Sequence, residues 1–247
     1  MATAAAARHV VAVPYPGRGH INPMLVVCRQ LAAADAAISV TVVVTEEWHA
    51  LLAAAGVPDA LPDRVRLATI PNVIPSERNR GADFAGFVEA VLVKMVEPVE
   101  QLLDRLTLEK KPDAIVADTF LTWGVAAGAA RGIPVCSLWT QPATFFLALW
   151  HLDRWPTADG DQGEEGLSCE SLDQYFPFPA LSSVKCSDIK IFRSMVPPIK
   201  QCAQVFSNVR KAQCVLFTSF YELETGAING TRQVVPCPIY TVGPSIP

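Results

Sequence analysis

Two side chains that can transfer or orient a proton, His20 and Asp118, each follow a predicted buried strand in this chain of 247 residues. His20 comes just before Asn22-Pro23, a pair typical of a helix N-cap followed by proline at the first helical position. In an open parallel sheet, ligands bind at this mouth between strand and helix. Histidine accepts a proton near neutral pH, so His20 is a candidate general base. A loop histidine bonded to backbone is an equally weighted alternative.

Asp118 closes the apolar stretch Ala114–Ala117, which predicts a carboxylate at the carboxyl edge of the sheet, on the same side as His20. There the carboxylate could accept a hydrogen bond from one imidazole nitrogen. It would fix the tautomer and stabilise the imidazolium that forms when the other nitrogen takes a proton. The alternative for an isolated Asp is a cap on the following helix. Because both residues fall on one edge, the pair is the favoured interpretation.

Thr140 follows another predicted strand at the same edge, so its hydroxyl either binds a ligand or caps the helix expected near Ala143. The glycine-rich stretch Gly17–Asn22 is not a dinucleotide fingerprint, because Asn22 occupies the third glycine position. This disfavours a nicotinamide-dependent oxidoreductase. We find no phosphate-binding loop and no cluster with metal-ligand spacing in the sequence, so no metal is expected.

Composition limits the classes of partner. The net charge of −4 argues against nucleic acid. Seven scattered cysteines without a C-x-x-C pair favour reduced thiols, and the N-terminus does not resemble a secretory signal, so we expect a cytoplasmic protein. The segment 132–152 contains no Asp, Glu, Lys or Arg, but Pro134 and Pro142 interrupt it. We therefore expect a strand, a loop and a buried helix there, and no stable membrane insertion.

Strand and helix patterns alternate, which predicts an α/β fold with a doubly wound, mostly parallel sheet. Thr157–Asp173 is predicted to be an exposed acidic loop. The strands are expected at Val10–Val13, Ile38–Val44, Val65–Ile70, Ala114–Ala117, Val135–Leu138, Cys214–Phe217 and Ile239–Val242. The helices are expected at Pro23–Ala34, Glu46–Ala55, Phe84–Leu106, Trp123–Ala130, Ala143–Trp155 and Pro198–Lys211.

Five stretches in sequence order resemble landmarks of the plant UDP-dependent glycosyltransferases of secondary metabolism. They are Val13–Met24, Val116–Phe120, Trp139-Thr140, Phe217–Glu224 and Val242–Pro244. Each motif alone is modest, but together they span nearly the whole chain.

The resemblance implies a Rossmann-like domain that forms the N-terminal half of a GT-B architecture. Residues 1–243 would be the acceptor-binding domain and residues 244–247 the start of an interdomain linker. The donor-binding C-terminal domain is expected to be absent, which would leave an exposed face for it. By the same resemblance, the enzyme transfers a sugar from a UDP-sugar, expected to be UDP-glucose, to a phenolic or similar small acceptor. Transfer inverts the anomeric carbon and uses no metal.

The resemblance also implies roles for single residues. His20 would be the base, Asp118 would orient it, and Thr140 would contact the donor sugar. Gly19 would let the backbone approach the ligand closely. Phe120 and Phe84, the latter after the third strand, would line the acceptor pocket. A non-catalytic small-molecule-binding remnant of such an enzyme is the alternative.

Overall fold

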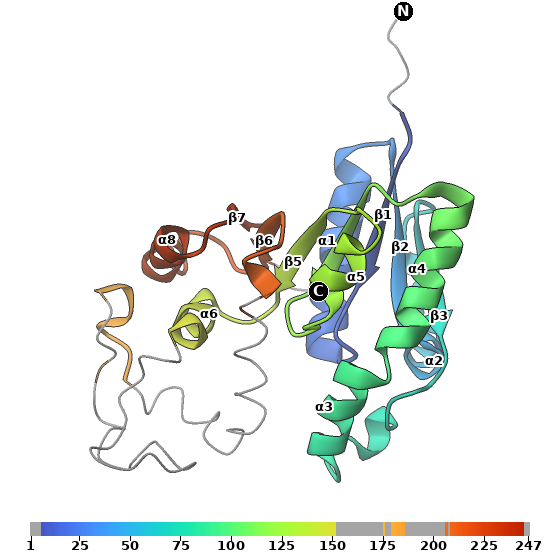
Figure 1. Cartoon of the computed structure of the whole chain (residues 1–247), viewed down its shortest axis with the longest axis horizontal. Coiled ribbons are helices and arrows are strands. Elements are labelled where there is room, and N and C mark those ends of the chain that lie inside the picture. The colour runs from blue at the N-terminus through green and yellow to red at the C-terminus, as the bar shows by residue number, and fades with distance from the viewer. Residues whose placement is uncertain (1–5, 152–174, 176–178, 186–205, 207, 245–247) are drawn as a thin grey trace, which may run out of the picture.

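A seven-stranded sheet forms the centre of the molecule (Figure 1). The computed structural model describes residues 6–151, 175, 179–185, 206 and 208–244. The strands are β1 (Arg8–Val13), β2 (Ile38–Thr45), β3 (Val65–Ile70), β4 (Ala114–Asp118), β5 (Val135–Trp139), β6 (Cys214–Phe217) and β7 (Ile239–Thr241). Their order is β3-β2-β1-β4-β5-β6-β7, and every neighbouring pair is parallel. The predicted parallel sheet is confirmed.

Helices cover both faces of the sheet, as a doubly wound fold requires. The helices are α1 (Arg18–Ala34), α2 (Glu46–Ala54), α3 (Phe84–Val93), α4 (Val96–Lys110), α5 (Gly124–Ala129), α6 (Ala143–Trp150) and α8 (Thr225–Val234). Short 3-10 helices in the described ranges are η1 (Pro58–Ala60), η2 (Glu77–Asn79) and η5 (Pro179–Leu181).

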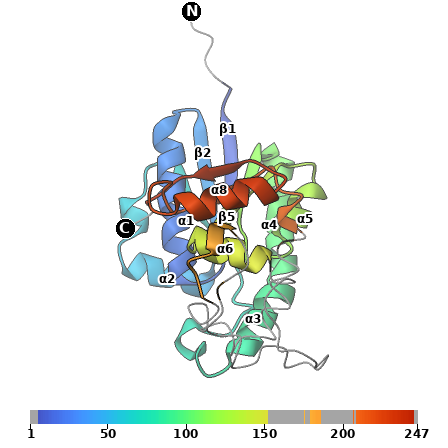
Figure 2. The same ribbon diagram turned by 90° about the vertical axis from the view of Figure 1, so that its left-hand side faces the viewer.

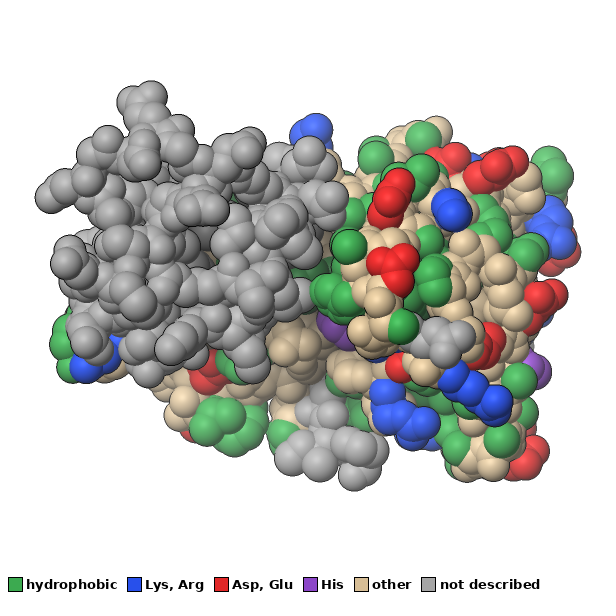
Figure 3. Space-filling model, turned by 90° about the horizontal axis from the view of Figure 1, so that it is seen from below, with side chains coloured by type: hydrophobic (Ala, Val, Ile, Leu, Met, Phe, Trp, Pro, Cys, Tyr) green, Lys and Arg blue, Asp and Glu red, His purple; other side chains and the backbone are tan. Residues whose placement is uncertain are grey.

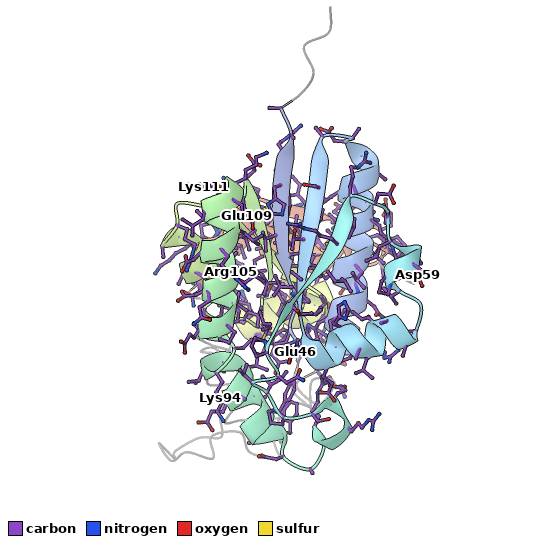
Figure 4. All side chains as sticks on the ribbon, turned by 90° about the vertical axis from the view of Figure 1, so that its right-hand side faces the viewer. Glu46, Asp59, Lys94, Arg105, Glu109 and Lys111 are labelled. Carbon is purple, nitrogen blue, oxygen red and sulfur yellow. The ribbon has the colours of Figure 1, made fainter. Side chains whose placement is uncertain are left out.

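Strand β1 shows why the strands of this sheet are apolar at consecutive positions. Val10 and Ala12 pack with α1, whereas Val11 and Val13 pack with α3 and α4 on the other face. Because successive side chains point to opposite faces, a strand covered on both sides needs apolar residues at every position. Helix α4, by contrast, is apolar on one side only: Leu103 is buried, and charged residues such as Arg105 and Glu109 face outward (Figure 4).

Helices α6 and α8 lie side by side at the β5–β7 end of the sheet (Figure 2). Their close packing depends on Gly230 in α8. A Cβ atom there would lie 2.5 Å from the Cβ of Ala180 and 2.9 Å from Cδ2 of Leu147. The core beneath them is aromatic, with Trp139, Phe146 and Phe217 fully buried.

The start of α1 differs from the prediction. The helix begins at Arg18, with Gly17 as N-cap, and Pro23 lies inside it, so the predicted cap at Asn22 is wrong. The Gly17 carbonyl accepts hydrogen bonds from the His20 and Ile21 amides, at 2.9 and 2.8 Å. Pro23 lies beyond the first turn, so its missing amide hydrogen costs α1 one intrahelical bond, the one to the Gly19 carbonyl. His20 therefore stands in the first turn of α1.

The segment predicted as one helix over Phe84–Leu106 forms two helices, α3 and α4, separated at Lys94 and Met95. Pro98 explains the break, because it has no amide hydrogen to bond the carbonyl of Lys94. Helix α8 was not predicted, since its glycines weaken the helical signal. The predicted loop Thr157–Asp173 and linker residues 245–247 lie outside the described residues, as does most of the predicted helix Pro198–Lys211.

The uncharged segment 132–152 contains β5, a loop and α6, as predicted. In the described part of the chain, no helix combines the length and apolar character needed to cross a membrane.

Candidate active site

The carboxyl ends of β1, β4 and β5 carry the predicted site residues. Because these strands are adjacent and parallel, the segments that follow them meet at one edge of the sheet. The view in Figure 3 is onto this edge, where hydrophobic and charged side chains are intermixed over the described surface. His20 comes from α1 after β1, Asp118 ends β4, and Thr140 follows β5.

His20 and Asp118 are in direct contact. Nδ1 of His20 lies 2.8 Å from Oδ2 of Asp118. The Asp118 side chain is fully buried, and that of His20 is 17% exposed. Because a carboxylate only accepts hydrogen bonds, this contact assigns the hydrogen to Nδ1 and leaves the lone pair on Nε2. Among the described residues, Nε2 has no hydrogen-bond partner.

Asp118 is held in place by its second carboxylate oxygen, Oδ1, which accepts a hydrogen bond from the Phe120 amide at 3.0 Å. Asp118 does not cap α5, whose N-cap is Trp123 without a side-chain hydrogen bond, so that alternative is wrong. One oxygen ties down the turn after β4, and the other orients the imidazole. The arrangement can stabilise an imidazolium and keep the same ring orientation before and after proton uptake.

Thr140 also contacts His20, with Oγ1 2.9 Å from Nδ1. It does not cap α6, whose N-cap is Pro142 without a side-chain hydrogen bond, so that alternative is wrong. The capping group comes instead from Glu224, after β6. Its carboxylate accepts hydrogen bonds from the Ala143 and Thr144 amides at 2.9 and 3.0 Å. Sequence reasoning did not identify Glu224 individually, although it closes one of the quoted motifs.

Burial raises the pKa of Glu224, but the hydrogen bonds from the Thr144 and Ala143 amides and from nearby hydroxyls outweigh burial. The net direction is a lowered pKa. The carboxylate is therefore the stable form at neutral pH, as an anion at a helix N-terminus should be.

Aromatic rings surround the imidazole. The ring centroids of Tyr15 and Phe120 lie 5.1 and 5.5 Å from that of His20. Trp139 stacks on Phe120 at 5.1 Å. Tyr15 and Trp139 were not predicted as site residues, although both lie within the quoted motifs. The Tyr15 and Phe120 rings make an apolar environment beside the imidazole of His20.

Phe84 and Phe87, one helical turn apart in α3, have different surroundings. Phe87 is buried and its ring lies 6.1 Å from that of Tyr15. Phe84, the predicted pocket residue, is 39% exposed at the first position of α3. The Tyr15 ring contacts both His20 and Phe87, so Phe87 belongs to the aromatic group around His20. Within the described residues, Phe84 is not among the rings in contact with His20, Tyr15 or Phe120. Its role in ligand binding stays a prediction.

The loop before His20 is anchored by Arg80, which sequence reasoning missed. Its guanidinium donates a hydrogen bond to the Pro16 carbonyl at 2.5 Å and lies 4.5 Å from the ring centroid of Phe87. It also forms an ion pair with Glu77. A Cβ atom at Gly17 would lie 3.1 Å from Nη2 of Arg80, so a side chain there would require the guanidinium to shift slightly.

Gly19 has the opposite environment. A Cβ atom there would meet no heavy atom within 4 Å, so its backbone faces open space. Among the described residues, no group of three or more His, Cys, Asp or Glu side chains is placed to hold a metal ion.

The fold matches that of plant glycosyltransferases of known structure. The chain superimposes on Phytolacca americana UGT2, solved with UDP-2-fluoro-glucose and pterostilbene, with a TM-score of 0.77 and 21% identity. The match covers 98% of this chain and 55% of that one. A second match is Medicago truncatula UGT71G1, solved with UDP-glucose, with a TM-score of 0.73, 18% identity and 98% and 52% coverage. The fold class is thus the N-terminal half of a GT-B architecture, as predicted.

Sequence comparison defines the family. No protein-family model matches the chain. UDP-glycosyltransferase 87A2 of Arabidopsis thaliana is 42% identical over 242 residues, covering 97% of this chain and 51% of that protein. The 7-deoxyloganetin glucosyltransferase of Gardenia jasminoides is 30% identical, with 96% and 52% coverage. The chain belongs to the plant UDP-glycosyltransferases, and it spans about half the length of the relatives it matches.

Proposed function

We propose that this chain is the acceptor-binding half of an inverting glycosyltransferase that uses a UDP-sugar. The acceptor is a hydroxyl of a small phenolic or other secondary metabolite. The observation that carries the proposal is the 2.8 Å contact between Nδ1 of His20 and the fully buried Asp118 carboxylate. It leaves Nε2 as the proton acceptor at the edge of a parallel sheet.

In the proposed reaction, Nε2 of His20 takes the proton of the acceptor hydroxyl. The acceptor oxygen forms a bond to the anomeric carbon of the sugar as the bond from that carbon to the UDP oxygen breaks on the opposite face. UDP leaves with the bonding electrons, and Asp118 stabilises the imidazolium. Such a base contributes on the order of 10²–10⁴-fold, and alignment with leaving-group stabilisation must supply the rest.

The surroundings of His20 support a flat, apolar acceptor, because Tyr15 and Phe120 present aromatic rings beside it. The stilbene in the Phytolacca americana structure is a ligand of that kind. We assign Phe120 and Phe84 to the acceptor pocket, Gly19 to close backbone approach, and Thr140 to the donor sugar. UDP-glucose is the proposed donor, and no metal is assigned to the reaction.

We further propose that residues 1–243 form the acceptor domain and that 244–247 begin a linker. Groups that bind uracil, ribose and diphosphate would belong to a separate donor-binding domain, which would meet an exposed face of this one. A reducing, cytoplasmic location is supported by seven scattered cysteines without a C-x-x-C pair.

The test compares two acceptors of similar shape, 4-methylphenol and 4-nitrophenol, in the protein translated from the complete transcript. Assays use a pH at which only the nitrophenol is largely ionised. His20→Ala should lower transfer to 4-methylphenol by about 10²–10⁴-fold. The loss with 4-nitrophenol should be much smaller, because an ionised acceptor needs no base.

His49→Ala is the matched control, since His49 lies on α2 and outside the site. It should leave both rates unchanged. Equal losses with the two acceptors in His20→Ala would mean that His20 is not the base. If the native protein transferred glucose to neither a phenol nor another small hydroxyl compound, the proposed function would be wrong.

A further inference from the structure

Two cysteines, Cys136 and Cys214, lie opposite each other on neighbouring strands. They stand near the amino ends of these strands, whereas His20 lies at the carboxyl edge of the sheet. The register of β5 and β6 pairs Cys136 directly with Cys214. Neighbouring strands are about 4.8 Å apart, which falls within the Cα separations of about 4.4–6.8 Å that a disulfide can span. Both thiols are free in the structure.

The two side chains meet on the same face of the sheet. With the two residues paired in register, the Cys214 thiol can donate a hydrogen bond to the Cys136 thiolate. This bond lowers the pKa of the Cys136 thiol against the opposing effect of burial. It raises the pKa of Cys214, and burial adds to that rise. Cys136 is thus the more nucleophilic partner, because the thiolate is the reactive form.

Two other described cysteines have less reactive surroundings. Burial raises the pKa of Cys28 to about 12. Burial also raises the pKa of Cys237, whose thiol donates to the Val209 carbonyl at 3.7 Å. Cys136 is half-buried, so a small oxidant can reach it, whereas Cys214 beside it is buried.

We propose that Cys136 and Cys214 form a dithiol site that a low-molecular-weight disulfide oxidises to an intramolecular disulfide. The Cys136 thiolate attacks one sulfur of the oxidant, forming a mixed disulfide and releasing one thiolate. The Cys214 sulfur, losing its proton, then attacks the Cys136 sulfur and expels the second thiolate. The two cysteines lose two electrons and two protons, and the oxidant becomes two thiols.

The test treats the native chain with oxidised glutathione, then unfolds it in denaturant, blocks the remaining thiols with iodoacetamide and maps tryptic peptides by mass spectrometry. Trypsin is well suited, because it places each relevant cysteine in a separate peptide. Cys28 falls in 19–29, Cys136 in 132–154, Cys214 in 212–232 and Cys237 in 233–247.

We expect a covalent link between peptides 132–154 and 212–232, with the loss of two hydrogens, reversed by dithiothreitol. Cys28 should remain alkylated in the same sample. In Cys214→Ser, the reaction should stop at a glutathione adduct on Cys136, and in Cys136→Ser no linked peptide should form. A stable glutathione adduct on Cys136 in the native chain, a link to Cys237, or no reaction at Cys136 would each overturn the proposal. The native-chain result decides the question even if a serine variant does not fold.

Discussion

At the scale of single residues, the orientation of the His20 ring is set by the contacts of its nitrogen Nδ1. Asp118 at the end of β4 and Thr140 after β5 both place an oxygen within 2.9 Å of that atom. With Nδ1–H as donor, both oxygens can accept from it, so the ring is fixed by two neighbouring strands. A side chain held in this way needs little reorganisation when Nε2 takes up a proton.

Replacing Asp118 by Asn should disrupt this arrangement without removing its volume. If the amide oxygen keeps the bond from the Phe120 amide, the amide nitrogen faces Nδ1 and donates to it. The hydrogen then moves to Nε2, the wrong tautomer for a base. We expect kcat for sugar transfer by the complete enzyme to fall about 10²–10⁴-fold, measured at saturating acceptor.

Thr140→Val is the comparison for that variant. It removes one acceptor from Nδ1 but leaves the carboxylate and therefore the tautomer. The expected loss in kcat is about tenfold or less, which corresponds to a single hydrogen bond. An Asp118→Asn enzyme as active as Thr140→Val would contradict the orienting role of Asp118.

At the scale of elements, the segment after β6 supports the segment after β5. Glu224 caps α6, and the Thr218 amide bonds the Trp139 carbonyl at 3.1 Å. Gly243, after β7, approaches the same segment so closely that a Cβ atom would lie 1.9 Å from the Thr218 carbonyl oxygen. The loop that carries Thr140 is thus held by the segment after β6, against which the segment after β7 packs in turn.

Glu224→Gln should therefore destabilise the fold. At neutral pH we expect a loss of about 0.5–2 kcal/mol in the free energy of unfolding, the usual range for a helix cap. The pKa of Glu224 in the folded chain lies below its ordinary value of 4.5. At a pH between these two values, the unfolded chain binds more protons than the folded chain. The free energy of unfolding therefore rises with pH in this interval. The difference in free energy of unfolding between the native chain and Glu224→Gln should be complete above pH 4.5. It should disappear as the pH falls through the pKa of Glu224 in the folded chain.

Urea unfolding at several pH values measures this difference. Glu222→Gln is the matched control, because Glu222 is exposed two residues away in the same motif. It should leave both the stability and its pH dependence unchanged. A Glu224→Gln chain as stable as this control at neutral pH would show that the carboxylate does not contribute through the α6 cap.

At the scale of the whole molecule, the described residues supply the proposed base and an aromatic surface at one edge of the sheet. The relatives that share this sequence are about twice as long, since the chain covers 51% of the Arabidopsis protein and 52% of the Gardenia one. In our proposal, stabilisation of the departing UDP is the task of the other half. Alignment of the two substrates would likewise require both halves.

The isolated 247-residue chain should therefore be a very poor transferase that still takes up phenolic ligands. Calorimetry with pterostilbene should give an affinity that UDP-glucose does not change. Radiolabelled UDP-glucose should yield product at a rate close to that of the His20→Ala chain. Robust, His20-dependent transfer by the isolated chain would show that the donor site does not require a second half.

The sequence by itself determined the alternation of strands and helices, the parallel sheet and the edge at which His20 and Asp118 meet. These follow from local periodicity and from the rule that parallel strands end on one side. Local patterns in the sequence misplaced the start of α1 and missed α8. Proline and glycine have low helix propensity, but tertiary packing keeps both segments helical. Only the tertiary structure decided that Thr140 contacts His20, that Glu224 caps α6 and that Cys136 faces Cys214. Each of these contacts joins residues about 80 to 120 positions apart, where no local pattern specifies which side chains will meet.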